Sequence, residues 1–402
     1  MDPVVIAGVK FPNVRTRPVA HLRLLAFRDG NAIPVPFQID ERTQAGEYVM
    51  TRPAGVRDRD DGLFDDNDEL VFMALDAGKR GDPKAGGFSP AGWDEIELTD
   101  PVTKARAYAY LAFFASDPPS LSPVSYMQYR ETPEYDELVT PYYTLRFPKN
   151  NVFIRDIMIH PSAGGNGQDF MDRIKMRLGV DILGGYWSVG RTEENFVSQV
   201  LGVARGPVRV IRQTDTRLVI LLHLKSPSAV VNGSFYPCSF QFPSMLSLPF
   251  RMDLVASDAS IRQGWDLNRN ALGMKFYSNL NPRPVTYDGK MDPEEVELAN
   301  NPHTLYWALC TGPAGTFIFK GVWEESSPLQ ARLYYEDDLS RLEPPEEDPG
   351  VMGFAYQLEN LLKMGTGRYP FNIVNYIVPN FDGDVPRALR VFDHPLQVAI
   401  NP

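Results

Sequence analysis

The feature that most constrains the fold is a repeated alternation of short apolar runs with turn residues. Runs rich in branched and aromatic side chains, such as 19–27 and 218–225, are separated at roughly 8 to 15 residues by clusters of Gly, Pro, Asn or Asp. This spacing is typical of antiparallel sandwiches and barrels, whereas parallel sheets need long helical stretches between their strands. The pattern therefore predicts a mainly β protein.

The turn-rich character does not extend to disorder. The 31 glycines and 35 prolines exceed average usage only moderately, and the 43% of hydrophobic residues is sufficient for a large core. Two prolines within 32–40 indicate an edge strand, where a missing amide hydrogen is tolerated.

The chain divides by composition into two predicted β units. We expect a small β-sandwich or barrel over 1–116, a proline-rich linker over 117–123, and a larger antiparallel β-sandwich with one or two short helices over 124–402. Asp292, followed by Pro293 and two acids, predicts a helix start. Residues 354–364 fit a helix by spacing but also fit a strand, and the acidic, proline-rich 343–349 indicates a solvated loop.

Charge narrows the possible partners. The net charge of −11, without a basic block, argues against nucleic acid, which needs clustered Lys and Arg. No apolar run reaches the roughly 18 residues that a membrane-spanning helix needs. No signal peptide is visible after Met1. We expect a mature end with an added Met, from a periplasmic or extracellular protein, and a cytosolic protein is the alternative.

The most specific local feature is the segment 58–69, in which eight of twelve residues are carboxylates or an amide around Gly62. Such a density of acids is self-repelling unless a hard cation neutralises it, and calcium prefers six to eight oxygen ligands. We expect a calcium ion there, and an exposed acidic loop is the alternative. The expected donors are Asp58, Asp60, Asp65, Asn67 and Asp68.

Other cofactors lack their motifs. No paired His or Cys residues have the spacing of a zinc or haem site, and no glycine-rich phosphate loop occurs, so we expect no nucleotide, haem or zinc. The two cysteines, Cys238 and Cys310, are compatible with one disulfide or with two buried thiols.

Aromatic residues beside polar ones suggest contacts with sugars, because pyranose C–H faces pack on rings. The strongest cluster is 265–270, and an aromatic pair occurs at 186–187. The alternative is that these rings belong to the core. The expected ligand-binding residues here are Trp187, Trp265, Asp266, Asn268 and Arg269.

Residues 33–41 (IPVPFQIDE) and 68–74 (DELVFMA) resemble the N-terminal β domains of bacterial polysaccharide lyases of the rhamnogalacturonan and rhamnose–glucuronate type, and of secreted bacterial proteins of uncharacterised function. Segments 172–177 and 206–212 are similar to strands of the galactose-mutarotase-like β-sandwich that follows in such lyases. The resemblance implies this two-part β fold more strongly than it implies an activity.

Such a lyase would need a base for the proton next to the uronate carboxyl group and a cation for the developing charge. The residues of suitable type are His160, Tyr186, Arg177 and Arg209. Strand alternation would place Arg173 with Arg177, and Arg205 with Arg209, on shared faces suited to carboxylates, with Arg212 opposite. The alternative is that these arginines pair with the chain's own acids.

Two functions follow. The first is a calcium-stabilised, non-catalytic module that binds carbohydrate or a protein partner. The second is a polysaccharide lyase or related carbohydrate-active enzyme acting on uronate-containing glycans.

Overall fold

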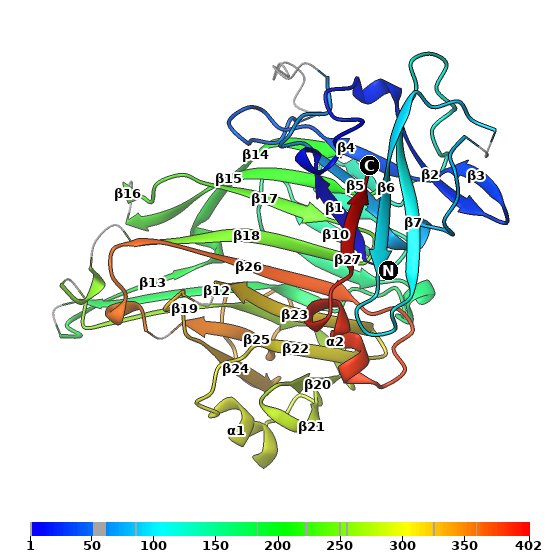
Figure 1. The fold of residues 1–402 in the computed structure, drawn as a ribbon. Helices are drawn as coiled ribbons and strands as arrows, with labels where there is room; N and C mark the ends of the chain where they lie inside the picture. The colour runs from blue at the N-terminus through cyan, green and yellow to red at the C-terminus, as the bar shows by residue number, and fades with distance from the viewer. Residues whose placement is uncertain are drawn as a thin grey trace. The chain divides into compact units, whose positions relative to one another are not determined.

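The structure is a computed structural model that describes residues 2–50, 62–84, 87–182, 184–221, 224–248, 251–254, 256–324, 326–358 and 360–402. It is 51% strand and 10% helix, with antiparallel sheets in sandwich-like layers (Figure 1). The predicted mainly β class is confirmed, as are its short helices. None of the helices in these ranges is long and apolar enough to cross a membrane.

The chain forms two compact units. Unit 1 comprises Met1–Gln128, Gly202–Ile211 and Gly383–Pro402, and unit 2 comprises Tyr129–Leu201 and Arg212–Asp382. The segments Gly202–Ile211 and Gly383–Pro402 are far in sequence from the rest of unit 1. The composition of the chain did not indicate that either segment belongs to this unit.

The described part of unit 1 forms two sheets, and β27 pairs with β6 in the second of them (Figure 1). The three-stranded sheet has the order β1 (Pro3–Ala7), β5 (Glu69–Met73), β4 (Phe37–Asp40). The five-stranded sheet has the order β27 (Gln397–Asn401), β6 (Gly92–Thr99), β7 (Arg106–Phe113), β2 (Leu22–Arg28), β3 (Asn31–Pro34).

The core of unit 1 lies between these sheets. Ile6, Leu70 and Phe72 of the first sheet pack in one cluster with Leu24 and Ile96 of the second. The predicted strand over 32–40 is split into β3 and β4, which belong to different sheets, so a single strand is wrong. The predicted edge position is confirmed, because each of the two strands lies at the edge of its sheet.

The described residues of unit 2 form most of three sheets. A four-stranded sheet has the order β11 (Asp156–Ile159), β10 (Tyr143–Pro148), β9 (Tyr135–Val139), β8 (Gln128–Glu131). A five-stranded sheet has the order β13 (Trp187–Thr192), β12 (Met171–Ile182), β19 (Asp258–Leu267), β25 (Val351–Leu358), β24 (Ala331–Asp338).

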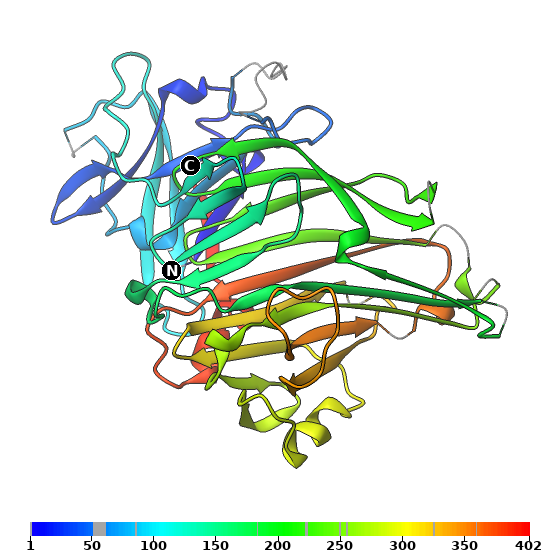
Figure 2. The same ribbon diagram turned by 180° about the vertical axis from the view of Figure 1, so that it is seen from behind.

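The ten-stranded sheet has the order β14 (Phe196–Arg205), β15 (Val210–Leu221), β17 (Ala229–Phe235), β18 (Ser239–Leu248), β26 (Gly367–Ile377), β23 (Gly315–Trp323), β22 (Trp307–Gly312), β20 (Lys275–Ser278), β21 (Asn281–Thr286), with β16 (Leu224–Lys225) paired to β15. Its central strands and the five-stranded sheet form two layers (Figure 1 and, from behind, Figure 2).

Aromatic rings fill the space between these layers. Trp265 of β19 stacks on Phe317 of β23 with ring centroids 4.5 Å apart, and Phe354 of β25 packs on Phe319 of β23 at 5.3 Å. Large flat side chains contributed alternately by both sheets bury much apolar area, and this burial is the main stabilising term of the unit. Cys238 and Cys310 are both buried and are not joined in a disulfide, which decides between the two cysteine alternatives.

Two α-helices occur among the residues that the structure describes. The predicted start at Asp292 is confirmed: α1 (Pro293–Ala299) begins with a capping box in which Asp292 and Glu295 accept each other's backbone amides. Residues 354–364 form the end of β25 and a 3₁₀ turn, so the strand alternative holds there. The helix α2 (Val385–Asp393), capped by Asp384, was not predicted.

Candidate functional site

Four cations gather on the face of the five-stranded sheet that points away from the aromatic core. Strand β12 contributes three of them, Arg173, Lys175 and Arg177, which alternate with inward side chains. Strand β19 contributes Arg262, the cross-strand partner of Arg177. Alternation places residues two apart on one face, so the four form a continuous row. We call Arg173, Lys175, Arg177 and Arg262 the cationic strip.

Carboxylates from the neighbouring strands and turns form ion pairs with the positive charges of the cationic strip. Lys175 Nζ lies 2.6 Å from Asp266 Oδ2, and Glu193 accepts hydrogen bonds from Arg173 at 3.3 Å and Arg177 at 2.5 Å. Burial raises the pKa of Asp266 to about 7, although Lys175 opposes the shift.

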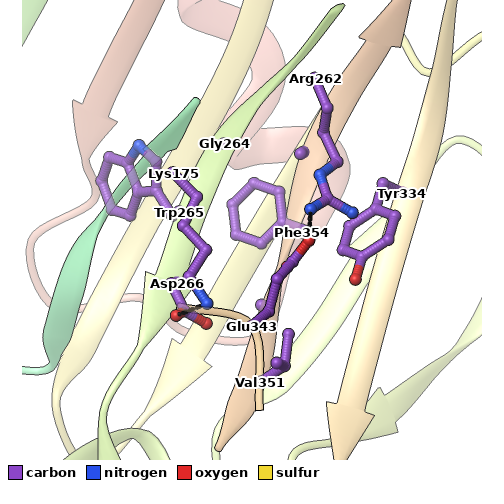
Figure 3. A pocket seen from close by; sticks show the side chains of 11 residues that line it. Lys175, Arg262, Gly264, Trp265, Asp266, Tyr334, Glu343, Val351 and Phe354 are labelled. Atoms are coloured by element: carbon purple, nitrogen blue, oxygen red, sulfur yellow. Dashed lines mark hydrogen bonds and ion pairs between the residues drawn. The ribbon is translucent and has the colours of Figure 1, made fainter. Parts of the chain in front are cut away.

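The remaining partners come from residues 343–348, which we call the acidic segment. Glu343 pairs with Arg262 and, at 3.6 Å, with Arg177, while Glu346 lies 3.3 Å from Lys175 Nζ. Figure 3 shows Glu343 reaching Arg262 across the sheet, beside Lys175 and Asp266. The predicted solvated loop is therefore wrong for this segment, because its acids cover the cationic strip.

Backbone contacts hold the acidic segment in place. Asp172, which is 3% exposed, accepts hydrogen bonds from the amides of Glu347 at 3.0 Å and Asp348 at 2.6 Å. Farther along, Glu347 pairs with Arg155 at 3.4 Å. The segment is thus attached near its end by backbone amides that donate to the buried Asp172 and along its length by side-chain ion pairs.

Lys175 and Arg262 of the cationic strip line a small recess. Tyr334 lies beneath the Arg262 guanidinium, 3.8 Å from the ring centroid to Cζ, and Lys175, Asp266 and Glu343 complete its polar wall (Figure 3). Burial raises the pKa of Tyr334 to about 12, so its hydroxyl is protonated at neutral pH, and it donates to Glu336 Oε2 at 3.4 Å. The recess therefore presents the cations Lys175 and Arg262, which suit a carboxylate ligand.

None of the four residues predicted from the sequence to be catalytic lines this recess. His160 contacts Thr144 Oγ1 at 2.9 Å and Pro141 O at 3.3 Å, and Tyr186 is 90% exposed in the β12–β13 hairpin. Arg177 belongs to the cationic strip, whereas Arg209 belongs to unit 1.

Arg209 is a buried structural residue. Only 2% exposed, it places Nη2 2.5 Å from Asp40 Oδ2 and 2.6 Å from Glu69 Oε2. The Gln38 side chain accepts the Arg209 amide at 2.7 Å and donates to its carbonyl at 3.1 Å. The expected shared face with Arg205 is wrong, because a turn at 206–207 separates the exposed Arg205 from buried Arg209.

The predicted sugar-binding cluster at 265–270 is divided between core and surface. Trp265 is 3% exposed and stacked between rings, so no ring face is left for a sugar. Asn268 caps a 3₁₀ turn and donates to Asp169, and Arg269 pairs with Asp348 at 3.5 Å. Trp187, in contrast, is 64% exposed.

Arg212 is buried too, with Nη2 3.2 Å from Asp136 Oδ2. With Arg173, Arg177 and Arg209, it favours the alternative that these arginines pair with the chain's own acids.

The expected calcium donors are only partly within the described residues: Asp58 and Asp60 lie outside them. Asp68 is fully buried and accepts the backbone amides of Arg42 at 2.8 Å and Asp65 at 2.7 Å. The Asn67 side chain donates to Thr43 O at 2.8 Å. Within the ranges that the structure describes, no group of three His, Cys, Asp or Glu is arranged to hold a metal.

Sequence reasoning missed Lys175, Arg262, Glu343 and Glu346 as site residues. The alternation of 172–178 was a usable signal for Lys175, because it lies between Arg173 and Arg177 on one strand face. The acids gave no signal, since Glu346 is 171 residues away from Lys175.

Comparison with known proteins places the chain in no family: no family model matches it, and no curated protein matches it in sequence. Among solved structures it is similar to an alpha-mannosidase from Enterococcus faecalis V583, with 10% identity and a TM-score of 0.43 over 78% of this chain. The match spans 39% of the mannosidase.

Proposed function

We propose that the protein is a secreted or periplasmic, non-catalytic binding module for carboxylate-bearing carbohydrate, recognised by the cationic strip. The observation that carries the proposal is the pairing of Arg177, Lys175 and Arg262 with successive carboxylates of one stretch of chain. A uronate polymer also presents carboxylates in series, and guanidinium groups match carboxylates in both charge and geometry.

The ligand must compete with the acidic segment. Side chains of the strip are between 7% and 17% exposed, so a glycan reaches them only when Glu343 and Glu346 move away. Charge pairing of this kind weakens as salt screens it, so binding should fall with ionic strength.

The exposed pair Tyr186 and Trp187 supplies a second type of contact. Both rings are accessible, at 90% and 64%, at the hairpin end of the β12 strand that carries the strip. Exposed rings of this kind can stack on a neutral sugar of a mixed polymer.

The lyase alternative has less support. A base must lie within reach of the proton that it removes. Tyr334 is held protonated in the recess, and His160 is engaged with Thr144.

The test is a binding panel of polygalacturonate, other uronate polymers and a neutral glucan. The variant is Arg177→Ala with Arg262→Ala, and the control is Arg283→Ala, whose side chain is 80% exposed on β21. We expect a uronate preference in the wild type and the control and a loss of about tenfold or more in the double variant. Melting curves verify that each variant is folded.

Absence of a uronate preference in the wild type, or its retention in the double variant, would refute the proposal. In the first case, a protein partner becomes the remaining ligand class. Ultraviolet absorbance of an unsaturated product, monitored in the same samples, would instead establish the lyase alternative.

A further inference from the structure

The connection between β24 and β25 is longer than its turn requires. These antiparallel neighbours pair as far as Asp338 and Val351, so residues 339–350 join two positions that already lie side by side. Hairpin connections of this kind usually take about two to five residues. Twelve residues, 339 to 350, are present here, and they include the acidic segment. We call residues 339–350 the strap, and its additional length calls for a role beyond reversing the chain.

The strap extends from the β24 edge of the five-stranded sheet, across β19, to β12. Glu343 reaches Arg262 on β19, and Glu346 lies 3.3 Å from Lys175 Nζ on β12 (Figure 3 shows the first of these contacts). The Arg177 Nη2 group also donates to the Glu343 carbonyl oxygen at 2.9 Å. Side chains and backbone of the strap therefore occupy the positions at which the cationic strip would bind carboxylates of a ligand.

The contacts of the strap with the strip are polar. Leu342, Pro344 and Pro349 of the strap are all exposed, so these apolar side chains are not buried against the sheet. A segment held mainly by ion pairs, with little apolar burial, belongs to the parts of a protein that open at low cost. Because carboxylates of a ligand match the same cations, the strap can be exchanged for the ligand without disturbing the aromatic core.

The two ends of the acidic segment are attached differently. At 347–348, two backbone amides donate to Asp172, whose side chain is 1% exposed. At the other end, the Glu343 side chain is 21% exposed and pairs with Arg262 and Arg177, which are 14% and 16% exposed. Charge pairs that water and salt can reach are weakened by screening. We therefore expect opening to begin at Glu343, while 347–348 stays attached to Asp172.

We propose that the strap is a self-inhibitory element, which keeps the cationic strip closed until a polymer bearing several carboxylates displaces Glu343 and Glu346. This inference rests on the proposed function, because it takes uronate polymers as the ligands of the strip. Closure lowers the apparent affinity in proportion to the fraction of molecules in which the strip is open. Loosening the strap should therefore raise the affinity for uronate, an effect that a purely structural loop would not produce.

Two variants loosen the strap by different means. Glu343→Gln removes one carboxylate from the strap and leaves every residue of the strip in place. The second variant replaces residues 339–350 by the dipeptide Asn-Gly, which suits a two-residue hairpin between β24 and β25. The control is Glu194→Gln, which removes the same charge at 3.9 Å from Arg173 but lies outside the strap and is 66% exposed.

Calorimetry with polygalacturonate at constant salt measures the affinity of each protein, and melting curves verify that each is folded. We expect binding to be about threefold tighter in Glu343→Gln and about tenfold tighter in the strap replacement, with a change of less than about twofold in the control. A Glu-specific endoproteinase reports the position of the strap separately. Cleavage after Glu346 or Glu347, detected by mass spectrometry, should be slow in the wild type and faster in Glu343→Gln or when polygalacturonate is added.

The outcomes separate this inference from the proposed function. Uronate binding that is no tighter in either strap variant than in the wild type would overturn the inhibitory role and leave the proposed function intact. Unchanged strap cleavage in wild type saturated with polygalacturonate would do the same. Absence of uronate binding in the wild type and in both strap variants would instead refute the proposed function, and the inhibitory role with it. Should the strap replacement fail to fold, Glu343→Gln decides alone, because it alters one partly exposed side chain.

Discussion

Replacing Arg209 with methionine tests how the charged cluster of unit 1 is stabilised. Arg209 is 2% exposed and approaches Asp40 and Glu69 at 2.5 and 2.6 Å. Methionine retains much of the stem volume but leaves two carboxylates facing each other. Burial already raises the pKa of Asp40, with Arg209 opposing that shift, so removing the guanidinium favours the protonated acid.

The magnitude follows from the contacts. Removing one partner of a buried ion pair costs about 3 to 5 kcal/mol, because the other charge is left uncompensated. Glu69 keeps a second cation, since Arg42 Nη1 lies 3.3 Å from its Oε1. We therefore expect a loss near the lower limit, about 3 kcal/mol, in the free energy of unfolding of unit 1.

Urea unfolding at pH 7.5 and pH 5 measures the effect. The matched control is Arg15→Met, whose pair with Asp66 is 38% and 66% exposed and should contribute less than about 1 kcal/mol. The deficit of Arg209→Met should shrink at pH 5, where the freed carboxyls take up protons. Adding Asp40→Asn should restore more than about 1 kcal/mol, because it removes one of the two facing charges.

An Arg209→Met variant as stable as Arg15→Met would refute the reasoning. So would a deficit that does not change with pH, because the buried carboxylates would then not be the cause of the loss.

Three further predictions concern pH, calcium and the core. Burial raises the folded-state pKa of Asp169 to about 7, so between roughly pH 4 and 7 the folded state holds a proton that the unfolded state has lost. Stability should therefore fall as the pH rises through this window, and it should fall less steeply in Asp169→Asn. Equal slopes of stability against pH in the two proteins, measured by urea unfolding, would contradict this prediction. If 58–69 binds calcium, saturating calcium at about 100 times Kd adds about 2.7 kcal/mol, and a melting temperature indifferent to calcium and chelator would end that hypothesis. Trp265→Ala should cost about 3 to 5 kcal/mol, and a loss below about 1 kcal/mol would show that its stacking on Phe317 contributes little.

The sequence was most informative where structure depends on neighbouring residues. The helix start at Asp292 was predictable because a capping box joins positions three apart, and the strand of 172–178 because alternation is local. The helix after Asp384 also has an aspartate at its N-cap and a proline in its first turn, and these local signals were missed.

Several residues from the segments that resemble polysaccharide lyases contact one another in the structure. Gln38 and Asp40 from one quoted segment and Glu69 from the other meet Arg209 from the third, and all lie in unit 1. Gly206 packs directly against the Gln38 side chain, where an added Cβ would lie 2.0 Å from Oε1. These residues assemble unit 1, which explains why Arg209 is not available as a catalytic cation.

Long-range partners are the part that sequence reasoning could not supply. The alternation of side chains predicts that Arg173 and Arg177 share one face of a strand. It does not predict whether that face is covered or which segment of the chain covers it. The carboxylates that cover these arginines come from the acidic segment. Its proline and glutamate content had predicted a solvated loop. Their pairing with the strip depends on β12 and β19 being neighbours, which is a property of the sheet order.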